Sequence, residues 1–208
     1  MSAVAEQKRR TFWLRQMQRW HWISAAVCLT AMLLFSITGI TLNHAGQIAA
    51  QPEVTTLNAK LPGPLLAQIA RTADAEKAPL PAAIAEWVET SIGVEAGARA
   101  AEWSDDEVYV SLPRPGGDAW LSIDRATGDV QYERTDRGWI SYLNDLHKGR
   151  NTGPIWSLFI DVFAVACVLF AGTGLFLLQL NSGRRPSTWP IVAVGVVLPV
   201  VLLILFVH

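Results

Sequence analysis

The chain has few charged side chains and few cysteines. Only 17% of its 208 residues are charged and the formal net charge is −1. Nucleic-acid-binding proteins need a basic surface to neutralise phosphates, so we expect no nucleic-acid partner. The two cysteines, Cys28 and Cys167, lie inside long apolar runs. Their spacing excludes a CxxC zinc or redox motif, and their placement predicts packing roles without a structural disulfide.

The segment 45–136 also lacks residues typical of catalysis. It contains neither histidine nor cysteine, and its acidic residues are scattered. Gly116 and Gly117 have no phosphate-loop context around them. We therefore expect this segment to bind a partner or serve as a scaffold.

Three apolar runs, at 22–42, 155–180 and 189–207, dominate the rest of the chain. Each has the roughly 20 residues that cross about 30 Å of hydrocarbon. The first run is too long for a signal peptide and is not followed by a small-residue cleavage site, so we interpret it as a retained anchor. The pattern predicts three transmembrane helices.

Basic residues predict the orientation of these helices. Lysines and arginines gather before the first run and between the last two runs: Lys8, Arg9, Arg10, Arg15, Arg19, Arg184 and Arg185. The positive-inside rule places both groups in the cytoplasm and the long intervening segment outside a bacterial inner membrane. The expected organisation is a cytoplasmic tail (1–20), a first transmembrane helix (21–44), a periplasmic domain (45–136), an interfacial amphipathic helix and loop (137–152), a second transmembrane helix (153–181), a cytoplasmic loop (182–187) and a third transmembrane helix ending in the periplasm (188–208).

The periplasmic segment is expected to be a small α+β domain. After a linker at 45–63 without strong periodicity, proline-initiated helical patterns appear at 64–72 and 81–92. The apolar period then changes to two, which predicts an antiparallel sheet. The predicted strands are 98–102, 108–112, 120–123 and 130–133.

An amphipathic helix is predicted just before the second apolar run. Its apolar stripe follows i, i+3, i+4 and i+7 spacing and consists of Trp139, Tyr142, Leu143 and Leu146. His147 continues the stripe, whereas Asn144, Asp145 and Lys148 fall mostly outside it. The imidazole of His147 is therefore expected to face the apolar side.

The ends of two apolar runs resemble each other. The first contains SITGITLNH and the second LFAGTGLFLL. Their small residues predict either contact surfaces between the two helices or room for a flat ligand beside the backbone.

Several segments resemble PepSY-associated transmembrane proteins. AWLSIDRATGDVQYE is similar to the closing hairpin of a PepSY domain. WISYLNDLHKGRNTGPIWSLFIDVFAVACVLFAGTGLFLL and QRWHWISAAVCLTAMLLFSITGITLNH resemble the family's membrane helices. Some larger relatives are inner-membrane reductases that hold haem between histidines and pass electrons towards ferric siderophores. This shorter chain has no flavin or nicotinamide signature, so an electron donor elsewhere would be needed.

Together with this resemblance, the positions of two histidines predict a haem b site. His44 and His147 are both expected at the outer membrane face, where they could be the axial ligands. Lys148 and Arg150 could then pair with the haem propionates. The alternative is that the histidines bond to backbone or water and that the two basic residues contact lipid headgroups.

Three other polar residues are secondary candidates. His208 could replace one axial ligand or bind nothing. His21 is either part of an aromatic belt or a ligand of a second haem shared with another subunit's His21, which would require a homodimer. Asp161 could orient an axial histidine, contact a partner helix, or bond to hydroxyls of the first span.

The resulting hypothesis is a haem-binding electron-transfer protein of the inner membrane. It would deliver electrons to a ferric chelate or a periplasmic redox protein. One alternative is a non-redox anchor whose PepSY-like domain binds or inhibits a periplasmic partner. A third is a bare metal ion at the same histidines.

Overall fold

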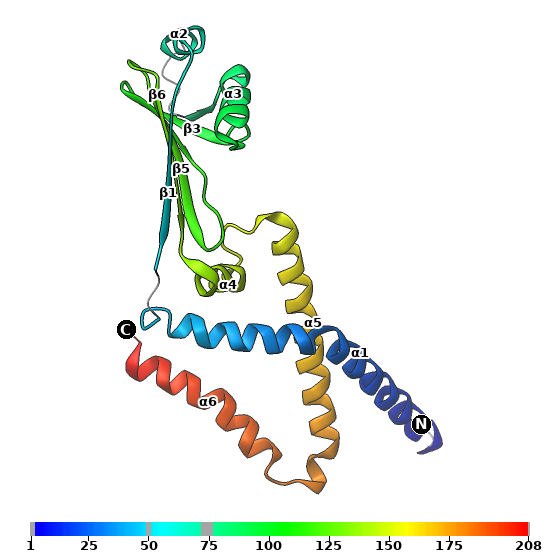
Figure 1. The fold of residues 1–208 in the computed structure, drawn as a ribbon. Coiled ribbons are helices and arrows are strands. Elements are labelled where there is room, and N and C mark those ends of the chain that lie inside the picture. Colours follow the sequence, from blue (N-terminus) through cyan, green and yellow to red (C-terminus); the bar gives the residue numbers. More distant parts are fainter. Residues whose placement is uncertain (1–2, 49–50, 72–76, 208) are drawn as a thin grey trace. The chain divides into compact units, whose positions relative to one another are not determined.

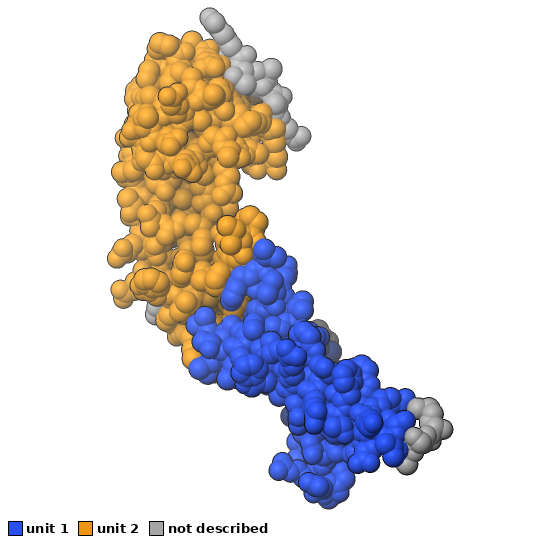
Figure 2. Space-filling view, turned by 90° about the vertical axis from the view of Figure 1, so that its right-hand side faces the viewer, with its two compact units in different colours: residues 1–34, 158–208 blue, residues 35–157 orange. Residues whose placement is uncertain are grey.

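The computed structural model describes residues 3–48, 51–71 and 77–207 (Figure 1). It divides into two compact units, coloured separately in Figure 2. Unit 1 consists of residues 1–34 and 158–208, and unit 2 of residues 35–157. Two long helices run from one unit into the other, so each unit is described by itself.

Long apolar helices make up unit 1. The helices are α1 (Ala3–Asn43, up to residue 34 in this unit), α5 (Gly153–Asn181, from residue 158), the short η1 (Ser182–Arg184) and α6 (Thr188–Phe206). Among the described residues, three helices are long and apolar enough to span a membrane. They cover the three predicted apolar runs, except that α6 ends one residue before the third run does. Most of their large apolar side chains are exposed, as expected where lipid is the solvent. The prediction of three transmembrane helices is confirmed.

Small side chains line the packing of α1 against α5 within unit 1. Ser24 and Cys28 on α1 are buried, as are Ala166 and Thr173 on α5. The Ser24 hydroxyl donates to the carbonyl of Trp20 at 2.7 Å, so its polar group is satisfied inside the helix. Small residues let helix backbones approach closely, which favours association in lipid.

Unit 2 contains an antiparallel six-stranded sheet with short helices, which confirms the predicted α+β domain. The strands are β1 (Glu53–Lys60), β2 (Lys77–Pro79), β3 (Ala100–Trp103), β4 (Glu107–Ser111), β5 (Gly117–Asp124) and β6 (Asp129–Asp136). Their order in the sheet is β1-β6-β5-β4-β3-β2. The helices of this unit are α2 (Gly63–Arg71), α3 (Ala82–Ile92) and α4 (Gly138–Lys148), together with the end of α1.

The expected linker at 45–63 is wrong in one respect, because it contains the edge strand β1. This strand pairs with β6 along its whole length, from Glu53 opposite Asp136 to Lys60 opposite Asp129. None of its residues is buried, so it lacks the alternation of buried and more exposed residues that marks β3, β4 and β5. The three-residue strand β2 was also not predicted.

The core of unit 2 lies between the sheet and helices α2 and α3. Ile69 from α2 and Ile84 from α3 are fully buried together with Leu121 of β5. We expect Leu121→Ala to lower the free energy of unfolding by about 2–5 kcal/mol, because it leaves a cavity in a packed core. Leu57→Ala is the matched control, because Leu57 is 42% exposed on β1. Denaturant unfolding followed by near-UV circular dichroism would contradict this packing if the two variants lost equal stability.

The turn between β5 and β6 is held by Asp124. Its carboxylate accepts hydrogen bonds from the backbone N–H groups of Thr127 at 2.7 Å and Ala126 at 2.9 Å. These bonds, that of Thr127 foremost, lower the pKa of Asp124. The contribution to stability is therefore present above the ordinary carboxyl pKa and is lost as the pH falls through the lower folded value.

Candidate functional site: two histidine cradles

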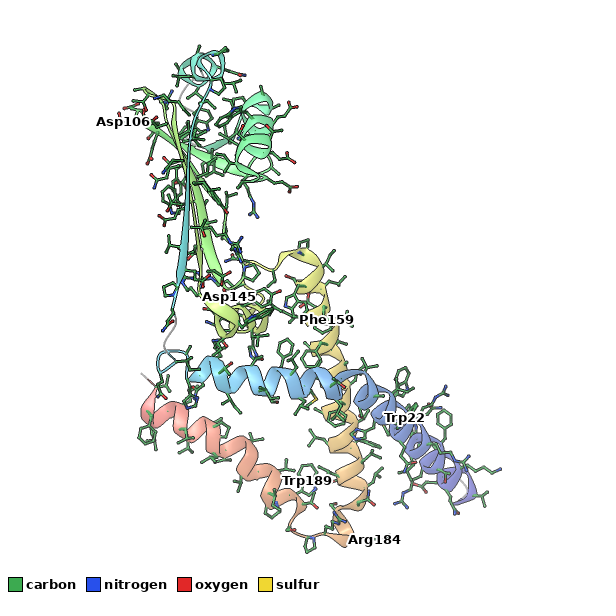
Figure 3. The ribbon with its side chains drawn as sticks, in the orientation of Figure 1. Trp22, Asp106, Asp145, Phe159, Arg184 and Trp189 are labelled. Atoms are coloured by element: carbon green, nitrogen blue, oxygen red, sulfur yellow. The ribbon has the colours of Figure 1, made fainter. Side chains whose placement is uncertain are left out.

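Helix α4 is attached to the sheet through the loop before β5. The backbone N–H of Gly116 donates to Asp145 at 2.8 Å (Asp145 is labelled in Figure 3). Gly116 has a φ of +76°, and a Cβ at this position would lie 2.8 Å from the Cα of Tyr142. Only glycine fits both this backbone conformation and this close approach. The contact fixes α4 against the end of the sheet.

A second face of α4 lies against the end of α1 within unit 2. Asn144 is 7% exposed, and its side-chain oxygen accepts a hydrogen bond from the Thr41 hydroxyl at 2.9 Å. Trp139 is 78% exposed. The predicted stripe was therefore wrong in placing Asn144 outside the buried face. Its partner is a hydroxyl on a helix about a hundred residues away in the sequence, so helical periodicity alone could not reveal it.

His147 lies one turn further along this face and is held by three residues of α1. Its Nδ1 is 2.7 Å from the Thr38 hydroxyl oxygen. That hydroxyl donates to the carbonyl of Phe35 at 3.2 Å, so it accepts a hydrogen bond from Nδ1–H. The Phe35 ring lies 5.0 Å from the imidazole, and a Cβ on Gly39 would lie 3.5 Å from Cε1. A Thr38 hydroxyl that donates to the Phe35 carbonyl favours the tautomer of His147 with the proton on Nδ1 and the lone pair on Nε2.

His21 in unit 1 is held in the same way by α5. Its Nδ1 lies 3.1 Å from both the Phe170 carbonyl and the Thr173 hydroxyl. The Thr173 hydroxyl donates to Leu169 and Phe170 carbonyls at 2.6 and 3.1 Å. The Phe170 ring stacks on the imidazole at 4.6 Å, and a Cβ on Gly174 would lie 3.2 Å from Cε1. Nε2 is again the nitrogen that keeps its lone pair.

The two sites share the pattern F-x-x-T-G, at 35–39 and at 170–174. We call each pattern with its histidine a histidine cradle: the phenylalanine contacts the ring, the threonine accepts from Nδ1–H and the glycine gives room at Cε1. The resemblance between SITGITLNH and LFAGTGLFLL predicted small residues at a helix contact or beside a flat ligand, but it did not indicate that His147 and His21 would contact them. In the structure Gly39 and Gly174 each face an imidazole, whereas a Cβ on Gly172 would have no neighbour within 4 Å among the described residues.

His44, the predicted partner of His147, follows the last residue of α1. Its side chain is exposed, and Nδ1 lies 2.9 Å from the carbonyl of Ile40. A carbonyl oxygen can only accept, so this contact places the proton on Nδ1 and the lone pair on Nε2. Lys148 and Arg150 lie just after His147 and are exposed, and the described residues provide no ion pair for either.

The remaining candidates contribute less. His208 lies outside the described residues. Asp161 is exposed on α5 in unit 1, and it has no hydrogen bond or ion pair to the described part of the chain. Within that part, no three histidine, cysteine or acidic side chains gather as a group that could hold a metal ion.

A comparison with protein families identifies the chain. The family model of PepSY_TM-like proteins matches residues 12–208. The chain belongs to the PepSY_TM-like family. Searches of curated proteins and of solved structures found no match. In this PepSY_TM-like chain the matched region contains both histidine cradles, the sheet, helices α5 and α6 and all of α1 from residue 12 onwards.

Thr38 should control which nitrogen of His147 carries the proton. Thr38→Val keeps the shape of the side chain but removes the acceptor for Nδ1–H. A hydrogen bond of about 1 kcal/mol corresponds to a roughly fivefold shift of the tautomer ratio towards Nε2–H. Carbon and nitrogen NMR shifts of labelled histidine would report this shift, and Thr38→Ser should restore the original ratio. An unchanged ratio in Thr38→Val would show that Thr38 does not hold the ring.

Proposed function

We propose that this PepSY_TM-like protein binds haem b and transfers electrons in a bacterial inner membrane, with His147 and His44 as the axial ligands. The tautomers of the two rings support this proposal. Each uses Nδ1–H as a donor, to Thr38 in one case and to the Ile40 carbonyl in the other. A ring fixed in this way offers Nε2 to a metal, which is the usual arrangement of a ligating histidine.

Residues around His147 suit such a ligand. Phe35 offers an apolar ring, and Gly39 leaves space beside Cε1. Lys148 and Arg150 would hold the propionates through charge-assisted hydrogen bonds. Bound haem would supply one-electron exchange at its iron. Thr38 would orient His147. Asp145 would hold α4 against the sheet by accepting a hydrogen bond from Gly116.

The proposed electron path has its donor and acceptor outside this chain. The basic residues before the first span and between the last two support a cytoplasmic location for the N-terminal tail and for the loop between the last two spans. The sheet would then lie in the periplasm, where a ferric chelate or a redox protein would be the acceptor.

Haem and metal analysis of the purified protein tests the proposal. The full chain would be produced in haem-supplied cells and extracted in mild detergent. Pyridine haemochrome analysis should detect haem b in amounts comparable to the protein. A bound zinc or copper ion without haem would instead support a bare-metal site. Protein containing neither would support the PepSY module as a non-redox anchor.

A further inference from the structure

A cavity in unit 1 lies beside the His21 cradle. Its volume is about 570 Å³, and its lining includes His21, Gly174, Leu177 and Leu178. Asn181, Arg184, Arg185 and Thr188 line it around the turn from α5 to α6. Figure 3 labels Arg184 at this turn. The cavity therefore combines an apolar wall with two cations at the end of a membrane span.

The polar groups around this cavity have unused binding capacity. The described residues provide no ion pair for Arg184 or Arg185. Nδ1 of His21 is occupied by α5, so the ring can offer only the acceptor Nε2 to a ligand. The N-terminus of α6, at Thr188, adds the positive end of a helix dipole. A matching ligand has an apolar part, an anion for the arginines and a hydroxyl that donates to His21.

We propose that this cavity binds an anionic glycerophospholipid with a hydroxyl-bearing headgroup, of the phosphatidylglycerol type. The lipid phosphate pairs with Arg184 and Arg185, and a headgroup hydroxyl donates to Nε2 of His21. The acyl chains lie against Leu177 and Leu178. Such lipids are abundant at the cytoplasmic surface of membranes, where basic pockets between helices recognise them. The site would tie the turn between α5 and α6 to the membrane surface.

Lipid retention measured by native mass spectrometry tests this site. The full chain in mild detergent would be equilibrated with mixed micelles of phosphatidylglycerol and phosphatidylcholine. We expect retained phosphatidylglycerol and only background phosphatidylcholine. Arg184→Gln combined with Arg185→Gln should weaken phosphatidylglycerol binding roughly thirtyfold, because each arginine near an anionic lipid surface strengthens binding roughly fivefold and the two effects multiply.

Matched variants separate the site from general charge. Arg9→Gln with Arg10→Gln removes the same charge from residues of unit 1 that do not line the cavity, and should retain the lipid. Arg184→Lys with Arg185→Lys keeps the positive charge and should retain most of the lipid. This result would show that the turn tolerates substitution at both positions. The proposal would be overturned if the Arg9/Arg10 glutamine variant lost as much phosphatidylglycerol as the Arg184/Arg185 glutamine variant.

Two further measurements identify the chemical class of the ligand. Inorganic phosphate should not displace the lipid, because phosphate lacks chains to contact Leu177 and Leu178, and displacement would reveal a free-phosphate site instead. His21→Phe should reduce the preference for phosphatidylglycerol over phosphatidic acid, which has no headgroup hydroxyl. Unchanged phosphatidylglycerol retention in the variant that combines Arg184→Gln with Arg185→Gln would also overturn the proposal.

Discussion

His147→Ala is expected to lower the haem content of the purified protein at least tenfold. The variant removes the proposed ligand nitrogen, and changes to groups that merely support a metal ligand already cost 10–100-fold in affinity. Its effect should exceed that of Thr38→Val, which leaves Nε2 in place but releases the ring from α1. The ratio of Soret to protein absorbance measures the loss.

Trp139→Ala is the matched control for this experiment. Trp139 lies on the same helix but is 78% exposed, so its removal leaves the His147 cradle intact. We expect its haem content to equal that of the unmodified protein. If His147→Ala retained full Soret absorbance, the assignment of His147 as a ligand would be wrong.

Gly116→Ala is expected to detach α4 from the sheet. The positive φ of Gly116 alone costs alanine about 1–3 kcal/mol. In addition, the new methyl group would lie 2.8 Å from the Cα of Tyr142, a backbone atom that cannot rotate away. The hydrogen bond to Asp145 would then be lost as α4 moved. Hydrogen exchange should accelerate in α4 more than in β5.

Gly63→Ala provides the corresponding control for the loss of a glycine. Gly63 begins α2, and a Cβ there would have no neighbour within 4 Å among the described residues. Its exchange pattern should match that of the unmodified protein. Protected α4 amides in Gly116→Ala would contradict the proposed attachment of this helix.

Elements with a strong apolar period could be predicted from the sequence. The three long helices follow from runs that cross a bilayer, and β5 alternates buried and half-buried residues along its length. Strand β1 could not be predicted in this way, because it is held by backbone pairing with β6 and buries no side chain. Its position depends on a partner strand about 75 residues later in the sequence.

The candidate site could be predicted only in part. The amphipathic pattern indicated that His147 faces an apolar surface, and its contact with Phe35 agrees with this. The pairing of Thr38 with His147, and of Thr173 with His21, depends on how separate helices pack. The F-x-x-T-G pattern, which occurs twice, was the available signal. A five-residue pattern does not by itself indicate which side chain will pack against it. The proposed pairing of His44 with His147 stays a prediction.

The visible absorption spectrum of the purified full chain tests the central claim most directly. It would be recorded in mild detergent before and after dithionite, with protein from haem-supplied cells. The proposal predicts a Soret band and, after reduction, the sharp α band of a haem b with two axial histidines. Colourless protein whose spectrum does not respond to dithionite would contradict it.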